Sequence, residues 1–309
     1  MTVQYLRKTT LKIGNQTEAL DFSELHFRFT VRNSTAQTLK YAELTIYNLS
    51  DATAQKIQNE FTMIELSAGY EGNAALIFQG QIAYLERGKE DATTTFLTLR
   101  AQDGDQAFNH AYSNWTLAQG YRPDDVYNRF LQDLAPYGIT AGYKPTFAGN
   151  PSVDAFSCFG KTREHLRNFA LKQGCQWSIE NGQLNFLPKG QSFPGAVPII
   201  GPASGLIGTP TQTIGGINMT CLLNPMIRAG SKVQLDNSLL TSTTIRFPIT
   251  GSQAGDQVAG LDPGGFYTAV QVIHDGDTRG NVYYTHIVGV AVDGTAPSNT
   301  ALLNEVPEV

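Results

Sequence analysis

Cysteine is scarce in this chain of 309 residues. Its three cysteines, Cys158, Cys175 and Cys221, have no CxxC spacing. A zinc site would need a fourth ligand and closer spacing. We therefore predict that all three are small buried hydrophobic residues in a protein of a reducing compartment.

A surplus of positive charge is also absent. The chain has 22 lysines and arginines against 27 aspartates and glutamates, which gives a formal net charge of −5. Proteins that grip nucleic acid normally carry basic residues that neutralise phosphates, so this balance disfavours specific nucleic-acid binding. Hydrophobic residues make up 41% and charged residues 16%, which favours packed cores over disorder.

Signals for export and membrane insertion are missing as well. Residues 1–16 contain no apolar stretch of the kind found in signal peptides. No apolar run approaches the ~20 residues that a membrane helix needs. We expect synthesis in the cytoplasm without membrane insertion.

The sequence motifs of several common enzyme classes are also absent. The sequence has no GxSxG, HExxH, Walker A or GxGxxG pattern. Of the five scattered histidines, His26 and His286 fall on the polar phase of predicted strands, where an exposed histidine is far more common than a catalytic one. We therefore predict no catalytic, cofactor-binding or metal-ligating residue and no cofactor.

The densest polar cluster is residues 274–279, His-Asp-Gly-Asp-Thr-Arg. It can be interpreted as a metal loop, as an acid/base pair or as a hairpin turn. A calcium loop would need more oxygen ligands and a terminal bidentate carboxylate. The turn is favoured, with Asp275 and Asp277 bonding nearby backbone amides and with Gly276 and Gly280 at positive φ.

Two smaller polar features have similar alternatives. Glu86 and Asp91 flank another predicted turn, where carboxylates are more often solvated than catalytic. Trp115, with Tyr112 nearby, suggests either carbohydrate stacking or a packing anchor near a domain boundary, and the packing anchor is the commoner case.

Alternating apolar and polar residues dominate the first hundred positions and predict strands near 25–31, 43–47, 64–70, 78–84 and 96–101. Between them, Ser50 is a good N-cap for a short helix whose apolar face includes Ala54, Ile57 and Phe61. Several antiparallel strands and one short helix suggest a small barrel or sandwich.

The pattern changes in the middle of the chain. A helix is predicted from Pro123 to Ala135, and a second from Thr162, as its cap, to Gln173. A hairpin follows with its turn at Asn181-Gly182. Together these elements predict a compact α+β module.

Residues 191–216 are rich in Gly, Pro, Ser and Thr and are interpreted as a connector or irregular strand region. Strands return at 218–223, 232–235, 266–273 and 282–292, around a polar loop at 236–264. The predicted division is a β-rich part at 1–105, the α+β module at 106–190, a β-rich part at 191–295 and a tail at 296–309. No sequence repeat relates the two β-rich parts.

Three blocks of sequence form a recognisable series. The first joins a strand and capped helix at 42–50 to the segment 78–82, Phe-Gln-Gly-Gln-Ile. The second is the helix at 162–173 with the hairpin ending at 181–186. The third combines 205–210, 222–225 and 274–280. In this order the blocks resemble the baseplate hub proteins of contractile-tailed phages, and the resemblance spans nearly the whole chain.

The resemblance implies two tube-like antiparallel β-barrel domains, at 1–105 and 191–295, and a homotrimer. Two such domains per chain would let three chains imitate a six-fold ring. The implied role is structural: the ring joins the hexameric tail tube to the trimeric central spike, contacts other baseplate proteins and lines a channel through which DNA passes without specific binding. An acidic channel lining and a location in the virion tail are expected.

Two alternatives stay open. The first is a tail-associated cell-wall hydrolase, although the sequence offers no convincing pair of carboxylates and no cysteine–histidine pair. The second is a distal tail or receptor-adaptor protein, which six-fold assembly or glycan binding through Trp115 or Trp177 would favour.

Overall fold

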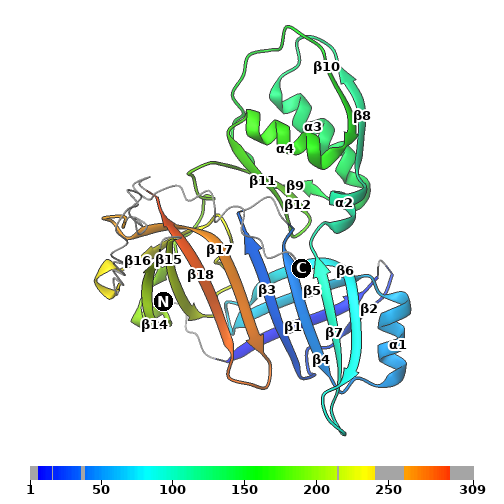
Figure 1. Ribbon diagram of the computed structural model, residues 1–309, viewed down its shortest axis with the longest axis vertical. Coiled ribbons are helices and arrows are strands. Elements are labelled where there is room, and N and C mark those ends of the chain that lie inside the picture. The colour runs from blue at the N-terminus through cyan, green and yellow to red at the C-terminus, as the bar shows by residue number, and fades with distance from the viewer. Residues whose placement is uncertain (1–5, 16, 36–38, 214–215, 241–260, 293–309) are drawn as a thin grey trace, which may run out of the picture.

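A computed structural model describes residues 6–15, 17–35, 39–213, 216–240 and 261–292. The fold is mainly β with a small α+β part, as the sequence analysis predicted. In Figure 1 the large sheet forms the lower part of the molecule and the α+β module stands above it.

The N-terminal part begins with a strand that the sequence analysis missed, β1 (Arg7–Gly14), which buries Leu11 and Ile13. Helix α1 (Asp51–Glu60) is capped as predicted, because the Ser50 hydroxyl accepts a hydrogen bond from the Thr53 amide at 3.2 Å. The other strands are β2 (Ala19–Asp21), β3 (Phe27–Ser34), β4 (Tyr41–Tyr47), β5 (Met63–Tyr70), β6 (Ala75–Lys89) and β7 (Thr95–Gln102).

The middle part contains both predicted helices, α3 (Pro123–Leu134) and α4 (Thr162–Lys172). The prediction that Thr162 caps α4 was wrong. Lys161 holds the N-cap position, while the Thr162 hydroxyl is buried 2.9 Å from that of Ser113. The remaining elements are α2 (Asp105–His110), β8 (Tyr112–Leu117), η1 (Ala135–Tyr137), β9 (Thr140–Ala141), β10 (Phe156–Lys161), β11 (Cys175–Glu180) and β12 (Gln183–Pro188).

The hairpin between β11 and β12 turns at Asn181 and Gly182, as predicted, and both residues have positive φ. This turn anchors the α+β module on the sheet. The Asp103 carboxylate accepts hydrogen bonds from the amides of Asn181 and Gly182, and Lys40 Nζ donates to Asn181 Oδ1 at 3.1 Å. Burial raises the pKa of Asp103 to about 6 although the Lys40 charge and the two amides oppose it.

The C-terminal part includes two strands inside the segment interpreted as a connector, β13 (Ile199–Ile200) and β14 (Leu206–Thr213). Residues 241–260 of the predicted loop and the predicted tail at 296–309 lie outside the described residues. The other elements are η2 (Pro202–Ser204), β15 (Gly216–Leu222), β16 (Lys232–Leu235), η3 (Asn237–Leu239), β17 (Phe266–Asp277) and β18 (Tyr283–Ala291).

The two β-rich parts share one thirteen-stranded sheet. Along its main path the order is β14-β15-β18-β17-β3-β4-β7-β6-β5-β1-β2, and each neighbouring pair is antiparallel. The parts meet where β17 pairs with β3, from Gln271 opposite Ser34 to Asp277 opposite Arg28. Figure 1 shows β18, β17 and β3 side by side at this junction, which we call the β3–β17 seam.

The strand order repeats itself across the seam. Each part contributes four strands in the spatial order first, second, fourth, third: β14-β15-β18-β17, then β3-β4-β7-β6. In each part an additional strand lies in the chain between the second and third, and it pairs with the third: β16 with β17, and β5 with β6. We call each set of four a four-strand unit.

The registers of the two units correspond as well. In one unit Glu43 of the second strand lies between Thr30 and Arg100. In the other, Asn218 lies between Thr211 and Val288. The third strand of each unit has a register shift against the fourth, between Ile82 and Tyr84 and between Ala269 and Gln271. The duplication is thus visible in connectivity and register although the sequence has no repeat.

Buried residues form three hydrophobic clusters. One lies between β3, β4 and β7 on one side and β1 and β5 on the other, one inside the α+β module and one under β15, β16, β17 and β18. Leu223 and Tyr283, from the C-terminal part, belong to the first cluster. Packing as well as strand pairing therefore joins the two β-rich parts.

Candidate functional site

The eight strands of the two units leave one side of the sheet uncovered by the described clusters. Cross-strand partners in an antiparallel sheet point to the same side. One row of such partners crosses all eight strands, and every member is exposed or half-buried: Gln81, Gln102, Tyr41, Arg32, Ile273, His286, Thr220 and Ile207. We call this side of the sheet the polar face.

A chain of hydrogen bonds runs along the polar face and across the seam. Thr220 Oγ1 and His286 Nδ1 are 2.9 Å apart, and His286 Nε2 lies 3.4 Å from Asp275 Oδ2. Thr30 then donates its hydroxyl proton to Asp275 Oδ1 at 2.6 Å. Partial burial opposes ionisation of Asp275, but the His286 and Thr30 contacts outweigh it and lower its pKa.

A second group of contacts lies on the polar face of the N-terminal unit. Tyr41 donates to Glu43 Oε2 at 2.9 Å, and Arg100 Nε lies 3.2 Å from the same oxygen. The Arg100 guanidinium also lies 5.5 Å from the ring centre of Tyr84. Burial, together with the bond to Glu43, raises the pKa of Tyr41 to about 12. Most charged side chains on this face therefore form an ion pair or a hydrogen bond with a neighbouring side chain.

Charge on the polar face is nearly balanced. Its strand positions carry three arginines and four carboxylates among the described residues: Arg28, Arg32, Arg100, Glu43, Glu86, Asp275 and Asp277. A surface of paired opposite charges presents a weaker net field than an equal number of unpaired acids or bases.

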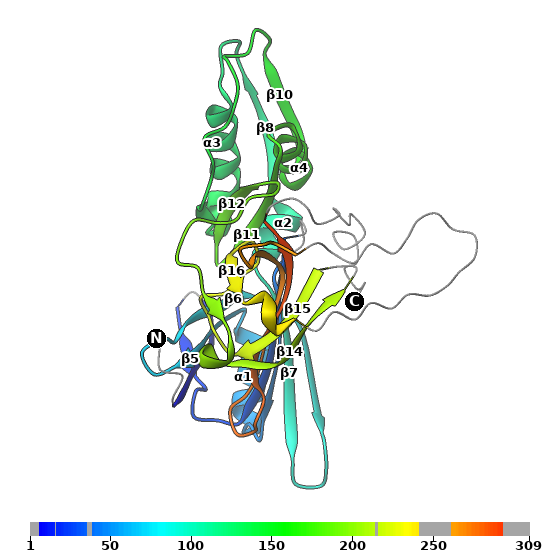
Figure 2. The ribbon, with the colours of Figure 1, turned by 90° about the vertical axis from the view of Figure 1, so that its left-hand side faces the viewer.

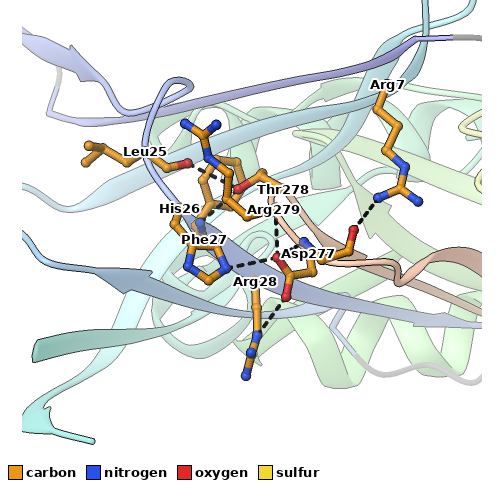
Figure 3. A network of polar contacts seen from close by, with 9 residues as sticks. Arg7, Leu25, His26, Phe27, Arg28, Asp277, Thr278 and Arg279 are labelled. Carbon is orange, nitrogen blue, oxygen red and sulfur yellow. Dashed lines mark hydrogen bonds and ion pairs between the residues drawn. The ribbon is translucent and has the colours of Figure 1, made fainter. Parts of the chain in front are cut away.

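Asp277 forms the densest polar network, at the end of the seam (Figure 3). Its carboxylate accepts hydrogen bonds from His26 Nε2 at 2.9 Å and from Arg28 Nε at 2.9 Å. It also accepts from the backbone amides of Arg279 at 2.9 Å and Gly280 at 2.8 Å. Partial burial opposes ionisation, but these four bonds together lower the pKa of Asp277 to about 2.

The turn itself is tied to the N-terminal part. Phe27 N donates to Thr278 Oγ1 at 3.0 Å, and Thr278 N donates to Phe27 O at 3.1 Å. Figure 3 also shows Arg7, whose guanidinium donates to the Gly280 carbonyl at 2.6 Å. Arg279 reaches the Glu24 carbonyl at 2.9 Å. These contacts close the seam at its lower end.

The structure corrects part of the predicted turn at 274–279. Strand β17 continues to Asp277, so Asp275 bonds Thr30 across the seam instead of nearby amides. Neither Gly276 nor Gly280 has the predicted positive φ. Glycine is needed at both positions because there is no room for a side chain. A Cβ atom on Gly276 would lie 2.2 Å from the Phe29 ring, and a Cβ atom on Gly280 would lie 2.6 Å from Asp277 Oδ2.

The other polar residues and the cysteines that the sequence analysis singled out make contacts that support the fold. His26 and His286 are half-buried and paired with carboxylates instead of freely exposed. Asp91 lies in a turn and binds the amides of Thr93 and Thr94, whereas Glu86 lies within β6. Cys158, Cys175 and Cys221 are buried and free, as predicted.

Both tryptophans pack inside the α+β module. Trp115 donates from Nε1 to Asp133 at 2.8 Å and meets the Phe130 ring edge-on, which confirms the packing prediction. Trp177 is buried and stacks on Phe108.

The cavity between α3 and α4, with a volume of about 300 Å³, has His165 and Lys172 in its wall but no carboxylate. Across the described residues, no group of three His, Cys, Asp or Glu side chains is placed to hold a metal ion. Nor does any helix in the described ranges have the length and apolar character needed to span a membrane.

The chain matches no family model, and no curated protein matches it. Solved structures do match. The 43 kDa tail protein of prophage MuSo2 from Shewanella oneidensis has a TM-score of 0.60 at 10% identity, covering 94% of this chain and 100% of that one. A tail protein from Neisseria meningitidis MC58 has a TM-score of 0.58 at 9% identity, covering 92% and 96%.

A third match is the c3393 protein of E. coli, a type VI secretion component described as structurally similar to the T4 tail proteins gp27 and gp5. Its TM-score is 0.52 at 8% identity, covering 93% of this chain and 79% of that one. At such low identity these likenesses establish a shared fold, which extends over nearly the whole chain.

Proposed function

We propose that this chain is the structural baseplate hub of a phage tail, a non-enzymatic homotrimer that joins the hexameric tail tube to the trimeric central spike. The observation that carries the proposal is the repeated four-strand unit. Because the units follow one another in the same spatial order within one sheet, three copies would place six equivalent units around one axis. A three-fold ring of this kind presents near six-fold symmetry to a hexameric tube.

The fold likeness supports the same assignment. The first two matching structures are named as tail proteins, and the third is a type VI secretion component described as structurally similar to T4 tail proteins. On this basis we assign the chain to the virion tail, with tail tube, spike and other baseplate proteins as its partners. Residues 1–105 and 191–295 supply the two ring domains, 106–190 the α+β domain and 296–309 a tail.

The polar face suits the wall of the DNA channel. Its charged groups are largely paired, so the channel offers passing phosphates neither an attractive basic stripe nor a strongly repulsive acidic one. This balance replaces the acidic lining that the resemblance led us to expect, and it fits passage of DNA without specific binding.

Native mass spectrometry of the full-length protein, followed by electron-microscopy class averages, tests the proposal. We expect a three-copy ring whose averages show six similar lobes. A stable monomer that binds neither tube nor spike protein would overturn the assignment, and a six-copy ring would support the distal tail alternative. Clearing of cell wall in a zymogram, abolished by one acidic substitution, would support the hydrolase alternative.

A further inference from the structure

The cavity between α3 and α4 has no role in the ring that we propose. Both helices lie in the α+β module, above the large sheet in Figure 1, and Figure 2 shows the same arrangement from the side. The cavity volume of about 300 Å³ lies at the lower end of the range of small-molecule sites, ~300–1,000 Å³. This size suits a ligand of one or two small rings.

Part of the cavity lining is apolar and aromatic. Val126 and Phe169 contribute buried side chains to it. Tyr121 and Phe156 are half-buried in the lining, and their ring centres lie 5.9 Å apart. The lining therefore offers aromatic surface against which the apolar face of a ligand ring can pack.

Helix α4 supplies one wall of the cavity. His165, Asn168 and Lys172 lie three and four residues apart, so they share one face of the helix. His165 Nε2 lies 3.1 Å from the Phe159 carbonyl oxygen, and because a carbonyl oxygen only accepts, Nε2 is the donor. The protein itself therefore orients this imidazole and leaves Nδ1 of the neutral ring as an acceptor.

Backbone contacts hold the opposite wall. Gly120 N donates to the Ser152 carbonyl at 2.7 Å, and Ser152 N donates to the Tyr121 carbonyl at 2.9 Å. Gly149 lies so close to Pro123 that a Cβ atom on it would be 3.1 Å from the Pro123 ring. The loop that ends at Ser152 is thus fastened to the start of α3, and both walls are held without a ligand.

Several polar side chains of the lining are unused by the fold. Four of them make no hydrogen bond or ion pair with the described residues: Asn150, Asn168, Lys172 and Gln173. Three carry amides, which donate and accept hydrogen bonds as the hydroxyl groups of a sugar do. The fourth, Lys172, carries a positive charge, and no carboxylate of the lining opposes it.

We propose that this cavity binds a sugar unit that carries one acidic group, with the acidic group at Lys172 and the hydroxyl groups at Asn150 and Asn168. The site goes beyond the structural role of the hub and does not depend on it. Uronic acids and sugar phosphates share the required chemistry. Both combine several hydroxyl groups with one negative charge on a small ring.

Glucose, glucuronic acid and glucose 6-phosphate test the proposal, because they share one ring and differ only at its exocyclic carbon. Binding to the full-length protein is measured by saturation-transfer difference NMR. We expect at least one acidic sugar to bind ~10-fold more tightly than glucose, because hydrogen bonds to charged groups are stronger than neutral ones. Tight binding of only one acidic sugar would identify the recognised group as a carboxylate or as a phosphate.

A substitution at Lys172 tests where the acidic group binds. Lys172→Ala should remove the preference, so that the acidic sugar binds no more tightly than glucose. Arg167→Ala is the matched control and should keep the preference. Arg167 is an exposed cation of the same helix, outside the cavity lining and without an ion pair to the described residues.

Three results would overturn the site: equal binding of all three sugars, saturable binding of none, or equal weakening by the two substitutions. The ring stands or falls separately, because its test is the number of copies in the assembly.

Discussion

Asp277 and Arg28 face each other across the β3–β17 seam, with Arg28 Nε donating to Asp277 Oδ2 at 2.9 Å. The same carboxylate holds the turn that follows β17 through two backbone amides. One side chain thus fixes both the junction of the two units and the hairpin that ends it.

Replacing Asp277 with alanine should therefore destabilise the fold by about 2–4 kcal/mol, because several charge-assisted hydrogen bonds are lost at once. Urea unfolding of the purified protein measures this. Asp91→Ala is the matched control: in the described part of the chain Asp91 bonds the neighbouring Thr93 and Thr94 within an exposed turn, and its loss should destabilise the fold clearly less than the loss of Asp277. Equal losses from the two variants would show that the contacts across the seam add nothing.

Asp277 should also make stability depend on pH in the acid range. Its pKa of about 2 lies below the value of about 3.9 in an unfolded chain. Its ionisation therefore contributes about 2 kcal/mol that is fully present above pH ~4 and is lost as the pH falls toward ~2. Unfolding measured between these values should show a slope that is reduced in Asp277→Asn.

The Tyr283 hydroxyl links β18 to β1 and β5. It lies 3.0 Å from Thr9 Oγ1, accepts from the Gly69 amide at 2.9 Å and can donate to the Gly69 carbonyl at 2.9 Å. Tyr283→Phe should cost about 1–3 kcal/mol because a buried amide loses its partner. Tyr284→Phe is the control. Tyr284 is half-buried on the polar face, so this variant should change the free energy of unfolding by about 0.5 kcal/mol or less.

Asp103 should control how firmly the α+β module is held. Asp103→Ala removes the acceptor for the amides of Asn181 and Gly182, so hydrogen exchange at that turn should accelerate about tenfold or more. Asp105→Ala is the control, since among the described residues the Asp105 carboxylate bonds Asn109, inside α2 and away from the turn. Unchanged exchange at the turn in Asp103→Ala would show that other contacts fix the module.

Removing two acids from the polar face should convert it into a phosphate-binding surface. The double variant Glu43→Gln/Asp275→Asn leaves the charges of Arg100 and Arg32 without their acidic neighbours. We expect this variant to retain double-stranded DNA in a filter assay at about 50 mM salt and to release it at about 200 mM, whereas the wild-type protein binds at neither concentration. DNA retention by the wild-type protein would contradict a neutral channel wall.

Local features of the fold were predictable from the sequence because they depend on short-range rules. Period-two alternation located β3, β4 and β5, and cap chemistry located the start of α1 at Ser50. Strand β1 was not predicted because its first half, Arg7 to Thr10, is polar. Only Leu11 and Ile13 indicate its buried side. The role of Thr162 was misjudged because a tertiary contact with Ser113 uses its hydroxyl.

Features that depend on distant parts of the chain were not predictable. The pairing of β3 with β17 joins segments more than two hundred residues apart, and no local pattern sets its register. The repeat was hidden because equivalent buried positions keep only their apolar character: Leu44 and Ile46 correspond to Met219 and Cys221. The polar network around Asp277 was missed for the same reason, since its partners His26 and Arg28 lie at the other end of the chain.

The change of partner halfway along β17 has an evolutionary consequence. A strand that leaves one neighbour and takes up the next does so whether that neighbour is attached by a peptide linker or belongs to a separate molecule. Gene fusion or fission between such building blocks would alter the number of polypeptides in the assembly while leaving its circumference unchanged. In the ring that we propose, a tube and a hub of different stoichiometry would in this way stack coaxially.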